Sequence, residues 1–135
     1  SDVCSSDLAV MHTNVLAAMR LLPIVGPLVA NTRGRLAVIS SRMGSIGERS
    51  NASGSLYRAS KAALNSVLKD AALSFGPQGV TCLSFHPGWV QTDMGGAGAP
   101  LSVQESVRTL RATLAGADAG KNGAFLNHDG TPISW

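Results

Sequence analysis

Hydrophobic positions along the chain follow two different periods. Three segments carry apolar residues at a spacing of three or four, which predicts amphipathic helices, and three short apolar runs bounded by turn residues predict buried strands. The helices are expected at residues 9–22, 56–75 and 103–116, and the strands at residues 35–40, 80–86 and 123–127. Helices that alternate with buried strands are typical of a parallel sheet covered on both faces. We therefore predict an α/β fold in the order helix, strand, helix, strand, helix, strand.

Proline, glycine and capping residues predict where the helices begin and end. We expect Pro23 and Gly26 to end or kink the first helix, and the Gly-Pro pair at residues 76–77 to stop the second. Ser102 and Glu105 form a capping box at the start of the third helix.

Composition excludes several classes of protein. With 135 residues, 44% hydrophobic and 14% charged, the chain is expected to form at most one domain. Eleven Lys and Arg residues against eight Asp and Glu give a net charge of +3, but the basic residues are scattered and no aromatic residues are interleaved with them, so we expect no nucleic-acid partner. The apolar stretch at residues 15–30 is interrupted by an arginine, a glycine and two prolines, so we expect no membrane span.

Cysteine and histidine spacing gives no sign of a disulfide framework or a metal site. Cys4 and Cys82 form no CxxC pair, which favours a reducing compartment and therefore a cytoplasmic location. His12, His86 and His128 lack metal-ligand spacing, and packing or surface positions account for them. We therefore expect no metal.

The first eight residues, SDVCSSDL, show neither helical nor strand periodicity. Their back-translation resembles the end of a common short-read sequencing adapter, so we interpret residues 1–8 as a non-native segment. On this interpretation Cys4 has no role, residues 9–135 are the native part, and the natural chain begins upstream. An uninterrupted native reading frame across this junction would contradict the interpretation.

A tyrosine and a lysine four residues apart are the first candidates for chemistry. Tyr57 and Lys61, in the sequence YRASK, lie on one face of the second predicted helix, about one turn apart. A nearby ammonium favours the phenolate form of tyrosine, so the pair suits general acid/base catalysis near neutral pH. The same spacing also occurs often among surface residues of amphipathic helices.

Further candidates follow two predicted strands, at the strand ends where parallel sheets bind ligands. The first strand ends at Ser40 and Ser41, and the second leads into HPGWVQTDM. Gly88 lets the backbone approach a ligand closely, and the main chain around Val90 with the Thr92 hydroxyl suits a flat polar group such as a carboxamide. An ordinary Pro-Gly turn is the alternative interpretation of this segment.

Together these residues resemble the short-chain dehydrogenase/reductase family from residue 9 to the end of the sequence. The resemblance rests on four elements in order: Asn14, the SSxxG segment at residues 40–44, the YxxxK segment, and the PGxxxT segment at residues 87–92. The phrases ISSRMGSIG and HPGWVQTDM and the ending DGTPISW look most like its C-factor or Sniffer-type carbonyl reductase branch. The resemblance implies a Rossmann fold, a doubly wound parallel sheet, of which this chain would be the C-terminal half.

The resemblance also implies four catalytic residues. Tyr57 would exchange a proton with the substrate oxygen while hydride moves between the nicotinamide and the carbonyl carbon. Lys61 would lower the pKa of Tyr57 and bind the nicotinamide ribose. Ser41 would hold the carbonyl oxygen, a role that Ser40 or another nearby serine could share. Asn14 would anchor a water molecule through which protons reach Lys61.

The implied cofactor site combines residues from the start of the second predicted helix with residues that follow the second predicted strand. Besides Tyr57 and Lys61 it comprises Pro87, Gly88, Val90 and Thr92, with Val90 and Thr92 on the nicotinamide carboxamide. The sequence contains no GxGxxG and no charged residue that can be placed at the end of a second strand. The choice between NADP and NAD therefore stays open, with NADP favoured.

We therefore interpret the chain as half of an NAD(P)-dependent oxidoreductase for a small carbonyl or alcohol substrate. The parent protein is expected to be a homo-oligomer, and the fragment alone inactive because the inner edge of its sheet lacks a partner strand. One alternative is a non-catalytic interaction or signalling module of the same fold. A less favoured one is a nucleotide-sugar epimerase or dehydratase, whose sizeable C-terminal substrate domain does not fit the short sequence after Lys61.

Overall fold

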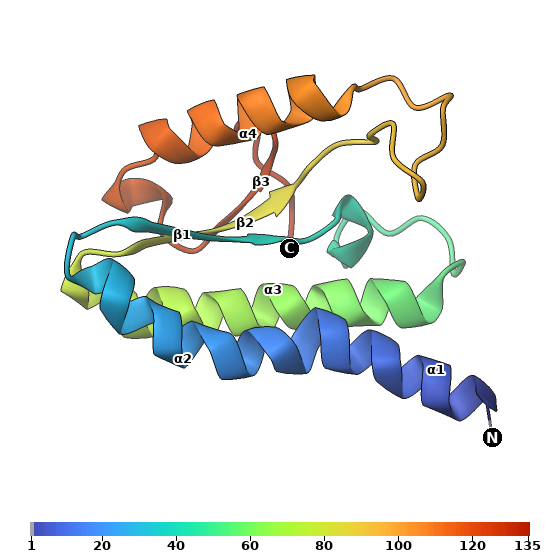
Figure 1. Cartoon of the computed structure of the whole chain (residues 1–135), viewed down its shortest axis with the longest axis horizontal. Coiled ribbons are helices and arrows are strands. Elements are labelled where there is room, and N and C mark those ends of the chain that lie inside the picture. Colours follow the sequence, from blue (N-terminus) through green and yellow to red (C-terminus); the bar gives the residue numbers. More distant parts are fainter. Residues whose placement is uncertain (1) are drawn as a thin grey trace.

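The computed structural model describes residues 2–135, which form a parallel three-stranded sheet in the order β1-β2-β3 between two layers of helices (Figure 1). The strands are β1 (Arg35–Ile39), β2 (Thr81–His86) and β3 (Ala124–Asn127). The long helices are α1 (Asp2–Met11), α2 (Ala17–Ala30), α3 (Ser55–Phe75) and α4 (Val103–Gly116), and the short ones are η1 (His12–Leu16), η2 (Arg42–Gly44), η3 (Gly76–Gln78) and η4 (Ala119–Lys121). Helices α2 and α3 lie on one side of the sheet and α4 on the other. The predicted α/β order is confirmed.

The central strand β2 contributes to the core on both faces of the sheet, because alternate side chains of a strand point in opposite directions. Toward α2 and α3 the core holds Leu22, Leu36, Val38, Leu64, Leu68 and Cys82. Toward α4 it holds Leu83, Phe85, Ala117 and Leu126. Leu68, Leu83 and Phe85 are 0% exposed, and full burial of such side chains stabilises a fold by roughly 1.5–3 kcal/mol each.

The N-terminal helical segment continues past the point where the sequence predicts its end. Helix runs from α1 through the π-helical turn η1 into α2 and stops only at Ala30, so the expectation that Pro23 and Gly26 end it is wrong. Pro23 and Pro27 are exposed, whereas Leu22 and Gly26 are buried and pack against α3. Packing of this face offsets the hydrogen bonds that the prolines remove.

The segment at residues 1–8 is also helical, although its sequence lacks helical periodicity. Helix α1 begins at Asp2, and residues 5–9 are exposed, so this part of the helix contributes nothing to the core. Its non-native origin stays a prediction. The side chain of Cys4 lies outside the described residues.

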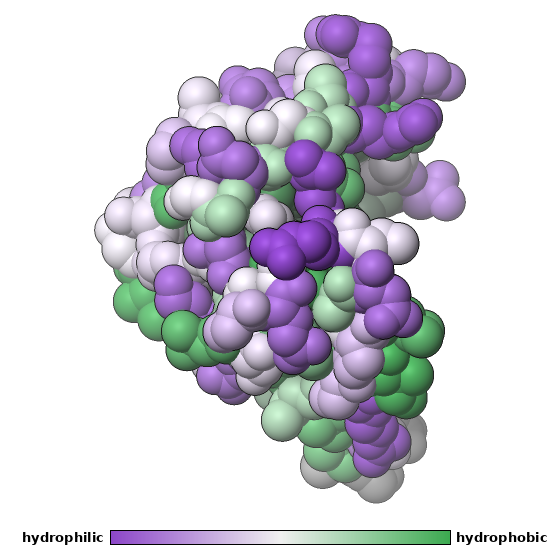
Figure 2. Space-filling model, turned by 90° about the vertical axis from the view of Figure 1, so that its left-hand side faces the viewer, coloured by the Kyte–Doolittle hydropathy of each residue, from purple (hydrophilic) through white to green (hydrophobic). Residues whose placement is uncertain are grey.

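Because the prolines are accommodated, the described residues contain one helix, Ser5–Ala30, that is long and apolar enough by length and composition to cross a membrane. Only 11% of its most apolar window is buried. Figure 2 shows hydrophobic side chains low on one end of the molecule, at the level that α2 occupies in Figure 1. Core helices of soluble proteins and signal sequences pass the same test, so the absence of a membrane span stays a prediction.

The two edges of the sheet differ. The outer edge of β3 is covered by the segment that follows it, through hydrogen bonds from Asn127 N to Thr131 O and from Ile133 N to Phe125 O. Among the residues that the structure describes, no strand pairs with the outer edge of β1. An uncovered edge of this kind is a template for another strand.

Candidate active site

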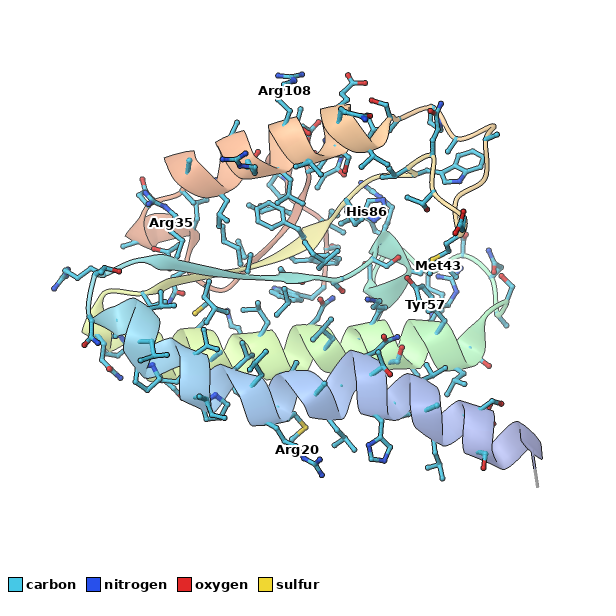
Figure 3. All side chains as sticks on the ribbon, in the orientation of Figure 1. Arg20, Arg35, Met43, Tyr57, His86 and Arg108 are labelled. Atoms are coloured by element: carbon cyan, nitrogen blue, oxygen red, sulfur yellow. The ribbon has the colours of Figure 1, made fainter. Side chains whose placement is uncertain are left out.

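A cavity of about 740 Å³ opens at the carboxyl ends of β1 and β2. Its walls come from the segment after β1, the start of α3, the segment after β2 and the first turns of α4. Figure 3 shows Met43, Tyr57 and His86 close together at this end of the sheet. Among the residues predicted from sequence, the cavity lining includes Ser41, Tyr57, Pro87, Gly88, Val90 and Thr92.

Ser41 follows β1 directly and is 8% exposed. Its backbone is extended, and its Oγ accepts a hydrogen bond from the Met43 amide at 3.1 Å, which caps η2. Gly44, three residues after Ser41, is required by close packing, because a Cβ there would lie 2.9 Å from the main-chain carbonyl carbon of Lys61. Glycine therefore allows η2 to pack directly on α3, beside the Tyr57-Lys61 turn.

The neighbouring serines are already engaged as donors. Ser40 Oγ donates to the Lys61 carbonyl at 3.4 Å, and Ser45 Oγ donates to the Trp135 carbonyl at 3.3 Å. Ser45 is fully buried, whereas Ser41 lines the cavity and its hydroxyl hydrogen donates to no residue that the structure describes. Ser41 is therefore the serine best able to donate to a ligand.

Tyr57 and Lys61 lie on the same face of α3, as predicted. The ammonium of Lys61 lies 5.8 Å from the centre of the Tyr57 ring and donates to the Ile39 carbonyl at 3.1 Å. Burial lowers the pKa of Lys61 below that of a free lysine. Lys61 does not itself line the cavity but places its charge between the end of β1 and the tyrosine.

Asn14 lies behind this pair rather than in the cavity. It occupies the π-helical turn η1, a feature that is rare in helices and frequent at functional sites. Its Nδ2 donates to Ser60 Oγ at 3.1 Å, and Ser60 Oγ donates to the Tyr57 carbonyl at 2.8 Å. Asn14 therefore contacts α3 through Ser60, and the water molecule expected beside it stays a prediction.

The segment after β2 turns sharply at Gly88, which has a φ of +87°. This conformation favours glycine, and a Cβ at this position would also lie 2.7 Å from Leu101 Cδ2, so the Leu101 side chain would have to shift. Thr92 Oγ1 accepts from the Gly95 amide at 3.1 Å, which leaves its hydroxyl hydrogen as a donor. The Val90 amide donates to no residue within the described part of the chain. Val90 and Thr92 thus offer one N–H and one O–H at the cavity wall.

His86, for which the sequence predicts a packing or surface position, lines the cavity. Its Nδ1 accepts a hydrogen bond from the Arg42 amide at 3.1 Å. Burial, followed by the charges of Arg42 and His128, lowers the pKa of His86 to about 4 against an opposing effect of Glu48. The local sequence signal for a position in the cavity lining is that the histidine lies between a predicted strand and a Pro-Gly turn.

The cavity also has an apolar wall. The side chains that form it are all more than 40% exposed: Trp89, Met94, Val103 and Val107.

Within the described residues, no group of three or more His, Cys, Asp or Glu side chains is arranged to hold a metal ion.

The chain is similar in sequence and in structure to several known proteins. The sequence pattern described as short chain dehydrogenase matches residues 6–99. C-signal of Myxococcus xanthus is 36% identical over 99% of this chain and 82% of its own length. Among solved structures, carbonyl reductase Sniffer of D. melanogaster has a TM-score of 0.88 and 35% identity, and covers 93% of this chain. The NADPH-bound carbonyl reductase from chicken fatty liver has a TM-score of 0.85 and 32% identity, and covers 97%.

The lengths of these relatives differ. The chain spans only 55% and 57% of the two carbonyl reductases, and 57% of a Rhodococcus dehydrogenase that is 29% identical. In both reductases the matched part has the same arrangement of sheet and helices. With most of its length matched by the family pattern and with C-signal as a close relative, the chain belongs to the short-chain dehydrogenase/reductase family.

Proposed function

We propose that this chain is the C-terminal half of an NADP(H)-dependent carbonyl reductase, the half that carries the catalytic side chains. The observation that carries the proposal is the meeting of Ser41 and Tyr57 in one cavity, with the Lys61 ammonium 5.8 Å from the tyrosine ring. Similarity to two carbonyl reductases, one of them bound to NADPH, supports the reaction class and the cofactor.

The residues present fit a nicotinamide. A carboxamide needs donors for its oxygen, and the Val90 N–H and the Thr92 hydroxyl hydrogen supply them at the cavity wall. Pro87 and Gly88 line the same cavity. When bound there, NADPH supplies the hydride that reduces the substrate carbonyl carbon.

The proton chemistry belongs to this chain's own residues. The Ser41 hydroxyl donates a hydrogen bond to the substrate oxygen and so places the carbonyl beside Tyr57. The Tyr57 hydroxyl donates its proton to that oxygen as the alcohol forms, which leaves a phenolate. The Lys61 ammonium stabilises the phenolate, and the tyrosine then recovers a proton from solvent through Lys61 and a water molecule that Asn14 would anchor.

The lining of the cavity favours an uncharged substrate. Arg42 and Glu48 pair with each other at 2.7 Å, and Arg58 is held by the Ser53 carbonyl at 2.7 Å. The apolar wall opposite them suits the carbon skeleton of a small aldehyde or ketone.

The chain alone is proposed to be inactive, because the phosphate-binding half of the cofactor site is absent from its sequence. The uncovered outer edge of β1 would pair with a parallel strand of the other half. The outward face of α2, formed by the exposed side chains of Leu21, Ile24 and Leu28, favours association with a second copy. A cytoplasmic location remains part of this proposal.

The experiment is to recover the full-length gene and to follow NADPH and NADH absorbance with a panel of aldehydes and ketones. We expect turnover with NADPH and at least a hundredfold loss of kcat in Tyr57→Phe, since a general acid contributes about 10²–10⁴-fold. Equal turnover by Tyr57→Phe would remove Tyr57 from the mechanism.

A second candidate is a non-catalytic module. It is favoured by the similarity to C-signal, of which this chain spans 82%. Under this candidate the full-length protein binds a partner but shows no turnover with any carbonyl in the panel, and Tyr57→Phe leaves partner binding unchanged.

A further inference from the structure

His86 joins the two strand ends that form the proposed active site. It is the last residue of β2 and directly precedes the Pro87-Gly88 turn. Its Nδ1 accepts the hydrogen bond of the Arg42 amide at 3.1 Å, across 44 residues of sequence. Arg42 is the residue after Ser41, so this bond links the end of β2 to the serine segment that follows β1.

The bond completes the set of contacts that fix the Ser41 hydroxyl. Helix η2 begins with the amides of Arg42 and Met43. The Met43 amide donates to Ser41 Oγ and thereby orients the hydroxyl, whereas the Arg42 amide donates to His86. Without His86, the Arg42 amide loses its acceptor, and Ser41 Oγ remains as the capping acceptor at the start of η2.

The bond also defines the protonation state of the ring. An imidazole nitrogen that accepts a hydrogen bond carries no hydrogen, so neutral His86 has its hydrogen on Nε2. A protonated ring would direct N–H against N–H at Arg42. Burial, Arg42 and His128 lower the pKa of His86 to about 4, which keeps the acceptor in place at neutral pH.

We propose that His86 is a positioning residue of the reductase, which fixes the Ser41 hydroxyl opposite Tyr57 by accepting the hydrogen bond of the Arg42 amide. The proposal rests on the proposed carbonyl reductase function. It assigns His86 no contact with the substrate and no proton transfer. Its effect is on the geometry of Ser41, and small displacements of such a group cost up to about a hundredfold in rate.

Two variants of similar size separate the acceptor from the bulk of the ring. In His86→Asn the side-chain oxygen is as many bonds from Cβ as Nδ1 is, so it still accepts from Arg42. In His86→Gln the oxygen lies one bond further out and cannot replace Nδ1 without displacing η2. In the full-length protein we expect kcat to fall about tenfold or more in His86→Gln and to stay within about threefold of wild type in His86→Asn, with an unchanged KM for NADPH.

A Ser41→Ala background tests whether His86 acts through the serine. If it does, adding His86→Gln to Ser41→Ala lowers kcat by less than about twofold, since the group to be positioned is already gone. Circular dichroism and thermal unfolding verify that each variant folds, and loss of exchange protection at the Arg42 amide in His86→Gln reports the broken bond directly.

Wild-type kcat in His86→Gln, equal losses in His86→Asn and His86→Gln, or a full tenfold loss on top of Ser41→Ala would each overturn the positioning role while leaving the reductase intact. A wild-type protein without turnover would overturn the proposed function, and the positioning role with it.

Discussion

The ammonium of Lys61 donates a hydrogen bond to the carbonyl oxygen of Ile39 at 3.1 Å. Ile39 is the last residue of β1 and lies two residues before Ser41, so this bond ties α3 to the strand that precedes the serine. The same ammonium lies 5.8 Å from the centre of the Tyr57 ring. Lys61 therefore combines a charge with a structural hydrogen bond, and Lys61→Met removes both.

Replacing Lys61 tests the charge. Lys61→Met keeps an unbranched side chain without the cation, and we expect kcat/KM of the full-length reductase to fall about a hundredfold or more because the phenolate of Tyr57 loses its counter-ion. Lys69→Met, on the same helix but outside the cavity lining, is the control and is expected to leave the rate unchanged. Wild-type rates in Lys61→Met would contradict the assignment.

The pH dependence of the rate gives an independent test of Lys61. Burial lowers its pKa below 10.5, so the cation is lost at a lower pH than in a free lysine, and kcat should begin to fall on the alkaline side below that value. In Lys61→Arg the guanidinium stays protonated, so the alkaline limb should move to higher pH even if the rate is lower. A limb at the same pH in both proteins would assign it to another group.

Close packing between Gly26 and Phe75 predicts a stability effect. A Cβ at residue 26 would overlap the Phe75 ring. We therefore expect Gly26→Ala to lower the free energy of unfolding by about 1–3 kcal/mol, although alanine favours helix over glycine by about 1 kcal/mol. Urea unfolding of the full-length protein measures this change.

Gly116 provides the matched control for that substitution. It also lies in a helix, at the end of α4, but nothing lies within 4 Å of a Cβ built there. Gly116→Ala should be neutral or stabilising. Equal effects of the two substitutions would show that helix propensity, not contact with Phe75, governs residue 26.

Local sequence signals predicted most of the fold because each depends on neighbouring residues. Ser102 accepts the Glu105 amide at 3.1 Å, as the capping pattern indicates, and α3 ends at Phe75, just before the Gly-Pro pair. The end of the first helix was mispredicted because it depends on α3. Leu22 and Gly26 are held against that helix, and no pattern within residues 9–30 reveals the packing partner.

Part of the candidate site could likewise be predicted from local sequence, and part depends on contacts between distant residues. Tyr57, Lys61 and the Gly88 turn are visible in the sequence because spacing and residue type define them. The contact of His86 could not be predicted, because its partner, the Arg42 amide, is a main-chain group 44 residues away. The link from Asn14 to Ser60 spans 46 residues and was likewise beyond any local pattern.

The lowered pKa of His86 predicts how stability depends on pH. The folded-state pKa is about 4 and the ordinary value is 6.5, so between these values the unfolded chain binds more protons than the folded one. The stability is therefore complete above pH 6.5 and decreases as the pH falls toward 4. The loss should be about 1–2 kcal/mol after allowing for solvent screening.

Urea unfolding at several pH values tests this effect. His86→Asn removes the titrating group and should flatten the decrease, whereas His12→Asn, at an exposed histidine in η1, should leave it as in the wild type. The same slope in wild type and His86→Asn would mean that other groups cause the acid loss.

The outward face of α2 predicts self-association of the full-length protein. Leu21, Ile24 and Leu28 are 56%, 65% and 64% exposed, and Ile24 and Leu28 lie one helical turn apart. Burial of such a side chain stabilises an interface by roughly 1.5–3 kcal/mol, so introducing a charge there should raise the dissociation constant at least about tenfold. We expect Ile24→Glu to shift the protein toward monomer in sedimentation equilibrium. Ile46→Glu, at an exposed residue of the loop after η2, is the control and should not.

The same variant distinguishes a protein partner from a lipid surface. If the α2 face binds membranes, the wild type remains monomeric at all concentrations but floats with lipid vesicles, and Ile24→Glu abolishes flotation rather than association. If it binds a second copy, vesicles recover neither protein, and only the dissociation constant responds to the substitution. A wild type that is monomeric and does not float would contradict both roles, because an apolar helix face of this size would then remain exposed to water in the full-length protein.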